Sequence, residues 1–246
     1  MPRKRNLYEP GAEKPFRLSR SKVDSFIKCK RCFYLDRRLG VSQPSGFPFN
    51  LNSAVDQLLK SEFDHYRDIS QPHPLMTEHG IDAVPLQHEK MGEWRENFTG
   101  VAYTDPTTNF TLFGAVDDLW RDNKSGDTIV VDYKATSKSG EVTIDADWQI
   151  AYKRQMEFYQ WLLRNNGLSV SDTGYFVYCN GRRDLERFDG KLEFNIKVIP
   201  YTGSDEWVEG TLREIFETLK SDEIPPSDPD CDLCKYTEET AAIPKS

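Results

Sequence analysis

Residues 110–121 (FTLFGAVDDLWR) and 128–135 (TIVVDYKA) carry most of the information about how this chain folds. Both stretches are rich in β-branched and aromatic residues, and the polar NKSG sequence at 123–126 separates them. Two such runs joined by a short polar connection predict a β-hairpin. Successive side chains of a strand point to opposite faces of a sheet, so we expect Asp132 and Lys134 to share one face.

The register of this hairpin predicts a pair of opposed carboxylates. When the chain is folded between residues 124 and 125, Asp117 lies opposite Asp132 and Asp118 faces away. Directly opposed side chains have Cβ atoms ~5 Å apart, so the two carboxylates repel unless a cation or proton lies between them. Mg²⁺, which prefers oxygen ligands, would fit there. A slipped register that brings Asp118 opposite Asp132 is one alternative, and an ordinary hairpin with solvated charges is another.

The apolar spacing in the rest of the chain predicts further helices and strands. Helices are expected from about Ser19 to Gly40, at 52–67, at 147–166 and at 205–220, and strands at 173–179 and 191–200. Residues 68–92 are expected to be mostly loop. The histidines show no ligand spacing and are expected at surface or loop positions: His65, His73, His79 and His88.

The composition predicts a soluble protein in the cytoplasm. No stretch approaches the ~18 apolar residues of a membrane helix, so no membrane partner is expected. The basic N-terminus lacks the apolar segment of a secretory signal. Residues 1–18 are expected to be loose, and residues 19–246 to form one domain with a C-terminal cysteine tail. The net charge of −8 argues mildly against a general nucleic-acid coat protein, but a catalytic cleft can be locally positive.

Four of the five cysteines form two C-x-x-C pairs. Cys29 and Cys32 are expected on one face of a helix, whereas Cys231 and Cys234 lie in a proline-rich tail. In a cytosolic protein such pairs favour metal or redox chemistry over structural disulfides. Four thiolates fit Zn²⁺ or an iron–sulfur cluster. Four unrelated reduced thiols are the alternative, and Cys179 is expected in the core.

These motifs together resemble a known family. The GAVD sequence ending at Asp117, followed by Asp132-Tyr133-Lys134 at the end of an apolar strand, is similar to motifs II and III of PD-(D/E)XK nucleases. Within that superfamily the chain most resembles the RecB-like branch, which includes AddB and CRISPR-associated exonucleases. That branch carries a Gln-x-x-x-Tyr motif on the next helix, here Gln155 and Tyr159. The resemblance covers roughly residues 19–165 and the cysteine tail.

The resemblance implies a fold and an activity. The implied fold is α/β, with a mixed central sheet flanked by helices and a restriction-endonuclease-like core. The implied activity is metal-dependent hydrolysis of DNA. Asp117, Asp132 and the carbonyl of Tyr133 would hold Mg²⁺ or Mn²⁺, and Lys134 would orient or help to deprotonate the attacking water. The Gln-x-x-x-Tyr pair would position DNA or the water at the metal.

The sequence departs from the family pattern at two places. RecB-like enzymes place a histidine ligand on an early helix, and Asp56 occupies that position here. Asp56 can ligate a hard cation, although a solvated Asp56 is the alternative. The relatives bind a [4Fe–4S] cluster with one N-terminal and three C-terminal cysteines. The third C-terminal cysteine is missing here, so Cys32 would supply the fourth ligand, and the choice between a cluster and zinc stays open.

Two other functions are compatible with this sequence. The first is a catalytically silent nucleic-acid-binding module that keeps the fold, against which the retention of Asp117, Asp132 and Lys134 argues. The second is a metal-clasped protein-interaction domain in which the Asp-x-Lys motif is accidental. The sequence predicts no particular protein partner.

Overall fold

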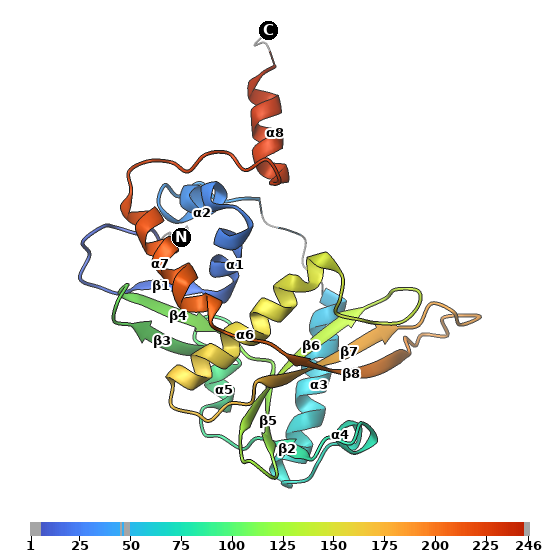
Figure 1. Cartoon of the computed structure of the whole chain (residues 1–246). Helices are drawn as coiled ribbons and strands as arrows, with labels where there is room; N and C mark the ends of the chain where they lie inside the picture. Colours follow the sequence, from blue (N-terminus) through green and yellow to red (C-terminus); the bar gives the residue numbers. More distant parts are fainter. Residues whose placement is uncertain (1–5, 45, 47–49, 244–246) are drawn as a thin grey trace. The chain divides into compact units, whose positions relative to one another are not determined.

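A computed structural model describes residues 6–44, 46 and 50–243 of the chain (Figure 1). The contacts divide it into two compact units. The terminal unit consists of Met1–Gly46, Tyr103–Phe113 and Glu206–Ser246, and the central unit consists of Phe47–Ala102 and Gly114–Asp205. None of the helices in the described residues is long and apolar enough to cross a membrane.

The terminal unit combines a small sheet with helices from both ends of the chain. Its elements are β1 (Phe16–Ser19), α1 (Arg20–Lys28), α2 (Lys30–Arg37), most of β3 (Val101–Asp105) and β4 (Phe110–Gly114), α7 (Trp207–Lys220) and α8 (Asp232–Ala241). The sheet has the order β1-β4-β3, and β1 runs parallel to β4. The first strand therefore pairs with a segment about ninety residues further along the chain.

The helices of the terminal unit pack through apolar stripes. In α7 the buried residues Val208, Leu212, Ile215 and Leu219 recur every three or four positions, which is the spacing of one helical face. Contacts join α7 to both α1 and α2. Helix α7 thus packs beside the two N-terminal helices, so segments from both ends of the chain belong to the same unit.

The central unit is built on a five-stranded mixed sheet of order β2-β5-β6-β7-β8. Its strands are β2 (Ala83–Pro85), β5 (Asp118–Asp122), β6 (Thr128–Thr136), β7 (Thr173–Gly181) and β8 (Phe194–Thr202). Its helices are α3 (Asn50–Asp68), α4 (Pro74–Glu78), α5 (Met91–Trp94), η1 (Asp147–Gln149) and α6 (Ile150–Asn165). Strand β6 lies in the middle, antiparallel to β5 and parallel to β7.

Side chains alternate between the two faces of β6. Val131 and Tyr133 belong to an apolar core with Leu59 and Phe63 of α3. Asp132 and Lys134 point to the opposite face, where Lys134 contacts Gln155 of α6. Helices therefore cover both faces of a mixed sheet, which confirms the predicted α/β fold with a restriction-endonuclease-like core.

Several elements differ from the sequence prediction. The stretch at 110–121 is not one strand, because it breaks after Gly114 and continues in the second sheet as β5. At this break the Gly114 carbonyl lies against Gly100, so closely that a side chain at position 100 would collide with the carbonyl. The helix predicted to begin near Ser19 does begin at Arg20, directly after the strand β1, but it is interrupted at Cys29, which has an extended backbone. The segment 68–92 contains α4, β2 and part of α5, and the cysteine tail forms α8.

Candidate active site and cysteine centre

The hairpin has the register that the sequence predicts. Asp118 pairs with Val131 and Leu119 with Val130, so continuing the ladder by one residue places Asp117 opposite Asp132. The slipped register that would pair Asp118 with Asp132 is therefore wrong. Asp117 directly precedes β5, at the end of the hairpin away from its turn.

Asp132 is a buried carboxylate with an unusual lack of hydrogen bonds. It is 0% exposed; its Oδ1 accepts no hydrogen bond from the described residues, and its Oδ2 contacts only the ammonium group of Lys134. Its counter-charge is the ammonium group of Lys134, with which it forms an ion pair. A buried charge normally receives several hydrogen bonds, because its desolvation is costly. The unpartnered Oδ1 therefore retains its capacity to bind a cation.

Asp117 lies beside this pair and is held by the backbone. The N–H of Tyr133 donates a hydrogen bond to Asp117 Oδ2 over 2.8 Å, and Lys60 Nζ lies 3.7 Å from Asp117 Oδ1. Burial, together with the charge of Asp132, raises the pKa of Asp117 to about 6. The two carboxylates thus repel one another, and a bound cation would relieve that repulsion.

Asp56 approaches the same group from α3. Burial raises the pKa of Asp56, and the charge of Asp117 raises it further, which places the two carboxylates within electrostatic reach. Lys60 bridges them, with its ammonium 2.8 Å from Asp56 Oδ2. Sequence reasoning missed Lys60, although its position one helical turn after Asp56 was a usable signal.

Lys134 is the link between the carboxylates and α6. Its ammonium lies 3.5 Å from Gln155 Oε1, and Gln155 donates a hydrogen bond to the Tyr159 hydroxyl over 3.2 Å. The same ammonium lies 4.5 Å from the centre of the Tyr152 ring. Burial opposes its charge, but the carboxylates of Asp132 and Asp117 outweigh this and raise the pKa of Lys134. Lys134 therefore remains protonated at neutral pH in the metal-free protein.

Asp118 faces the other side of the sheet and has a structural role. It is 0% exposed and forms ion pairs with Arg67 and Arg95. It also accepts a hydrogen bond of 2.8 Å from the Tyr133 hydroxyl. Arg95 additionally donates to the backbone carbonyl of Asp117 over 3.0 Å. This network holds the backbone at Asp117 in place. Nothing in the sequence indicated that the two arginines would take part in it.

The structure brings the predicted residues of this site together in the central unit. They are Asp56, Asp117, Asp132, Tyr133, Lys134, Gln155 and Tyr159. Lys60 contacts both Asp56 and Asp117, and Lys134 pairs with Asp132. Among the described residues, the group whose metal-ligand atoms all lie within 4.8 Å of one another is the four cysteines.

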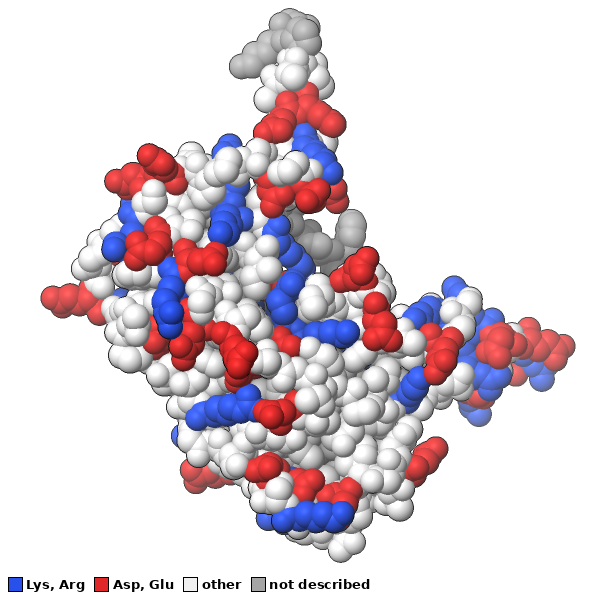
Figure 2. All heavy atoms as spheres, in the orientation of Figure 1, with Lys and Arg blue, Asp and Glu red and all other residues white. Residues whose placement is uncertain are grey.

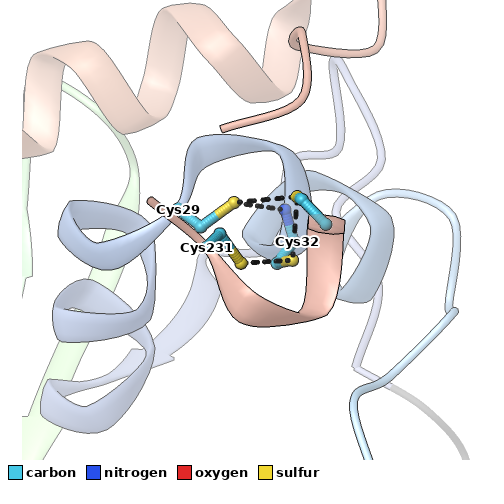
Figure 3. A group of neighbouring side chains, drawn as sticks. Cys29, Cys32 and Cys231 are labelled. Carbon is cyan, nitrogen blue, oxygen red and sulfur yellow. Dashed lines mark hydrogen bonds between the residues drawn. The ribbon is translucent and has the colours of Figure 1, made fainter. Parts of the chain in front are cut away.

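The four cysteines of the C-x-x-C pairs converge in the terminal unit (Figure 3). The Sγ–Sγ distances are 3.7 Å from Cys29 to Cys234, 3.7 Å from Cys32 to Cys231, and 3.9 Å from Cys32 to Cys234. Cys29 links α1 to α2 and Cys231 precedes α8, so these two positions project from the ends of helices. All four are free thiols, three of them buried.

The surroundings of the thiols favour unequal protonation. Burial raises the pKa of Cys29 and of Cys32. Burial also opposes ionisation of Cys234, but hydrogen bonds from the Asp228 backbone and from Ser227 lower its pKa to about 7. Metal ions bind thiolates, so Cys234 is the position most readily prepared for a first ligand bond.

One expectation about an individual side chain was wrong. Cys29 does not share a helical face with Cys32, because it occupies an extended position between two helices. His73 lies in the loop before α4, as predicted, but it is 2% exposed and stacks on Phe63 with ring centres 4.0 Å apart. Cys179 lies in the core of the central unit, where burial raises its pKa to about 11.

Comparison with known proteins identifies the family. The model of the PD-(D/E)XK nuclease superfamily matches residues 17–238, which is most of the chain. The chain belongs to this superfamily. It also resembles the crystal structure of SSO0001, with 15% sequence identity over 96% of this chain and 88% of that chain and a TM-score of 0.42, a likeness too distant to carry an argument. None of the curated proteins compared with the chain matches it.

PD-(D/E)XK proteins are usually nucleases that use divalent metals, and the residues present here fit such an ion. Asp132 Oδ1 has no hydrogen-bond partner among the described residues, and the pKa values of Asp117 and Asp56 are raised first by burial and then by a neighbouring carboxylate. Oxygen donors of this kind are the ligands that Mg²⁺ and Mn²⁺ prefer. The superfamily assignment and the donor set therefore point to the same chemistry.

Proposed function

We propose that this protein is a Mg²⁺- or Mn²⁺-dependent deoxyribonuclease of the RecB-like branch of the PD-(D/E)XK superfamily. The observation that carries the proposal is the buried carboxylate of Asp132, which pairs with Lys134, lies opposite Asp117 in the hairpin and has one oxygen, Oδ1, with no hydrogen-bond partner among the described residues. A purely structural aspartate at this depth would be expected to hold hydrogen bonds, as Asp118 does.

Each residue of the site has a proposed role. Asp117, Asp132 and the Tyr133 carbonyl would hold the metal, and Asp56 would contribute a further ligand in place of a histidine. When bound, the metal stabilises the negative charge that develops on the phosphate oxygens during hydrolysis. Lys134 orients the attacking water and assists its deprotonation.

Burial and the neighbouring charges prepare Lys134 for this role. The two carboxylates keep its ammonium charged in the free protein, and a cation shared with those carboxylates would weaken that hold. With its ammonium less strongly held, Lys134 would be able to accept a proton from the attacking water. Gln155 contacts Lys134, so it and Tyr159 are placed to position the water or the DNA phosphate.

The RecB-like assignment is supported by two features outside the acidic hairpin. One is the Gln155–Tyr159 pair, whose spacing of four residues on α6 places both side chains on the face that meets Lys134. The other is the cysteine centre, which joins the start of the domain to its tail. We propose that this centre holds a [4Fe–4S] cluster or Zn²⁺ and stabilises the terminal unit.

DNA is the proposed partner even though the chain is acidic overall. Basic and acidic side chains are interspersed on the face drawn in Figure 2. Several of the basic groups form ion pairs, for example Lys30 with Glu214 and Arg164 with Asp205. We therefore expect DNA binding to depend on the metal and on local contacts rather than on a broad positive surface.

A cleavage assay on defined DNA tests the proposal. Single-stranded, duplex and nicked substrates are incubated with the protein in Mg²⁺, Mn²⁺, Ca²⁺ or EDTA. We expect fragments with Mg²⁺ or Mn²⁺ and none with EDTA, and the Asp132→Asn protein should leave the DNA intact under all conditions. Binding without cleavage in every metal would instead favour a catalytically silent nucleic-acid-binding module.

A further inference from the structure

The spacing of the four cysteine sulfurs distinguishes between the two kinds of metal centre. Zinc–thiolate bonds are ~2.3 Å long, so the sulfurs of a tetrahedral site lie about 3.8 Å apart. The three distances between sulfurs given above are 3.7, 3.7 and 3.9 Å. A [4Fe–4S] cluster is held differently, because each cysteine binds its own iron atom and the sulfurs surround the whole cluster. The cysteines therefore lie too close together for a cluster and at the spacing required by a single ion.

The local backbone agrees with a single-ion site. Each C-x-x-C pair places its first cysteine in an extended conformation before a helix and its second cysteine within the first turn of that helix. The Cys32 N–H donates a hydrogen bond to Cys29 Sγ over 3.4 Å. Such a hydrogen bond stabilises the negative charge that the sulfur carries when it is a metal ligand. Two C-x-x-C pairs are the usual ligand pattern of a structural zinc site.

We infer that Cys29, Cys32, Cys231 and Cys234 bind one Zn²⁺ ion in a closed tetrahedral site. All four positions are then used by protein thiolates, so the ion is structural and has no open coordination site. It joins residues that are 205 positions apart in the sequence, Cys29 and Cys234, within one unit. The inference concerns this centre alone and does not depend on nuclease activity.

Metal and sulfide analysis of the purified full-length chain tests this inference. After anaerobic purification from medium containing both metals, we expect one zinc per chain, no acid-labile sulfide and no visible absorbance. X-ray absorption at the zinc edge should show four sulfur neighbours at ~2.3 Å. Cys29→Ser and Cys234→Ser should lower the zinc content, whereas Cys179→Ser, which alters a buried thiol of the central unit, should not. Iron with an equal amount of sulfide, or a chain that binds no zinc, would overturn the inference.

A second observation concerns an exposed aromatic residue beside Tyr152, the residue whose ring contacts Lys134. Trp148 is 62% exposed, whereas Trp94, Trp120 and Trp161 are 4%, 0% and 7% exposed. Its ring meets that of Tyr152 edge to face, with centres 5.5 Å apart. Since the Lys134 ammonium lies over the Tyr152 ring, the two rings lead from the candidate active site to the surface.

The turn that presents Trp148 is held rigidly. The neighbouring Gln149 is 1% exposed and donates a hydrogen bond to the Thr143 carbonyl over 2.8 Å. Its side-chain oxygen accepts a hydrogen bond from the N–H of Ala146 over 3.0 Å. A large aromatic ring that is exposed on a fixed turn offers a flat surface at little cost in conformational entropy.

We propose that Trp148 and Tyr152 form a stacking site for an unpaired nucleobase of the substrate. Every base has a flat π-face on which an aromatic side chain can stack, but in a continuous duplex the neighbouring bases cover those faces. The site would therefore favour single-stranded DNA or a frayed end over an intact duplex. This proposal rests on the proposed function, because it takes the substrate of the Lys134 site to be DNA.

Binding measured in a non-cleaving background separates this proposal from the nuclease assignment. Labelled single-stranded and blunt duplex oligonucleotides are titrated with the Asp132→Asn protein, alone and combined with Trp148→Ala, Trp148→Phe or Phe188→Ala. We expect Trp148→Ala to weaken single-strand binding about 5- to 100-fold and duplex binding much less. Trp148→Phe should restore most of the affinity. Phe188, 70% exposed in the same unit, is the matched control and should have no effect.

Two outcomes would overturn the stacking site without affecting the nuclease assignment. One is unchanged single-strand binding by Trp148→Ala. The other is an equal loss for single-stranded and duplex DNA, which would indicate a general disturbance of the surface. Cleavage by the wild-type protein, measured separately, would still support the proposed function in either case.

Discussion

The backbone N–H of Tyr133 donates a hydrogen bond to Asp117 Oδ2 over 2.8 Å. The hydroxyl at the other end of the same residue donates to Asp118 Oδ2, also over 2.8 Å. Tyr133 thus connects two adjacent aspartates that face opposite sides of the sheet. One of them belongs to the candidate metal site, and the other is buried in the network that supports it.

Metal binding should depend on pH through Asp117. Burial and the charge of Asp132 raise its pKa to about 6, so below that pH a proton competes with the metal. We expect the affinity for Mn²⁺, measured by calorimetry without DNA, to fall as the pH decreases below about 6, by up to about tenfold per pH unit. A constant affinity between pH 5 and pH 7 would show that Asp117 is not a ligand.

The same carboxylate should destabilise the metal-free protein at neutral pH. A carboxyl group whose pKa is raised by folding contributes stability at low pH, which is lost as the pH rises through the pKa of the folded state, here about 6. Asp117→Asn should therefore increase the free energy of unfolding in EDTA at pH 7, by about 1–2 kcal/mol after allowance for its partial exposure. Denaturant unfolding measures this, and the gain should disappear near pH 4. A variant less stable than wild type at pH 7 would contradict the proposed repulsion.

Asp118 should matter for stability rather than for metal binding. Asp118→Ala leaves the buried charges of Arg67 and Arg95 without this partner, which typically costs about 3–5 kcal/mol. Urea unfolding measures the loss, with Asp68→Ala on the exposed side of α3 as a control expected to change stability by less than about 0.5 kcal/mol. Equal effects of the two substitutions would mean that the buried network does not stabilise the hairpin.

Removal of zinc should destabilise the chain. Zn²⁺ present at 1,000 times its dissociation constant stabilises the folded state by about 4 kcal/mol, because it binds the folded protein and not the unfolded one. A strong chelator should lower the melting temperature of the wild-type protein, and added Zn²⁺ should restore it. Cys29→Ser should melt at the lower temperature with or without chelator. No response of the wild-type protein to chelation or to added zinc would contradict a structural ion.

The acidic hairpin could be predicted from sequence because its geometry is local. Strand alternation and a short turn fix the register by counting, and that count places Asp117 opposite Asp132, as the structure does. Pairing of the two C-x-x-C motifs was also predictable, since four thiols at a regular spacing favour one shared ion.

Other features depend on contacts between distant residues and had no signal in the sequence. Arg67 and Arg95 reach Asp118 from segments 51 and 23 residues away. The burial of His73 against Phe63 arises because the chain after α3 folds back on that helix. The break at Cys29 could not be predicted, because the helical spacing of apolar residues continues through this position. In the structure the Cys29 backbone is extended, and the Cys29 sulfur contacts that of Cys234.

Cleavage of DNA by matched site variants tests the central claim most directly. Wild-type protein, Asp132→Asn, Lys134→Ala and the surface control Phe188→Ala are compared in Mn²⁺ after circular dichroism has shown that each is folded. Removing a metal ligand or the lysine that orients the water should reduce the cleavage rate at least about 100-fold, because each acts on the transition state. Phe188→Ala should cleave like the wild type. Full activity in folded Asp132→Asn or Lys134→Ala protein would contradict the assignment of this site.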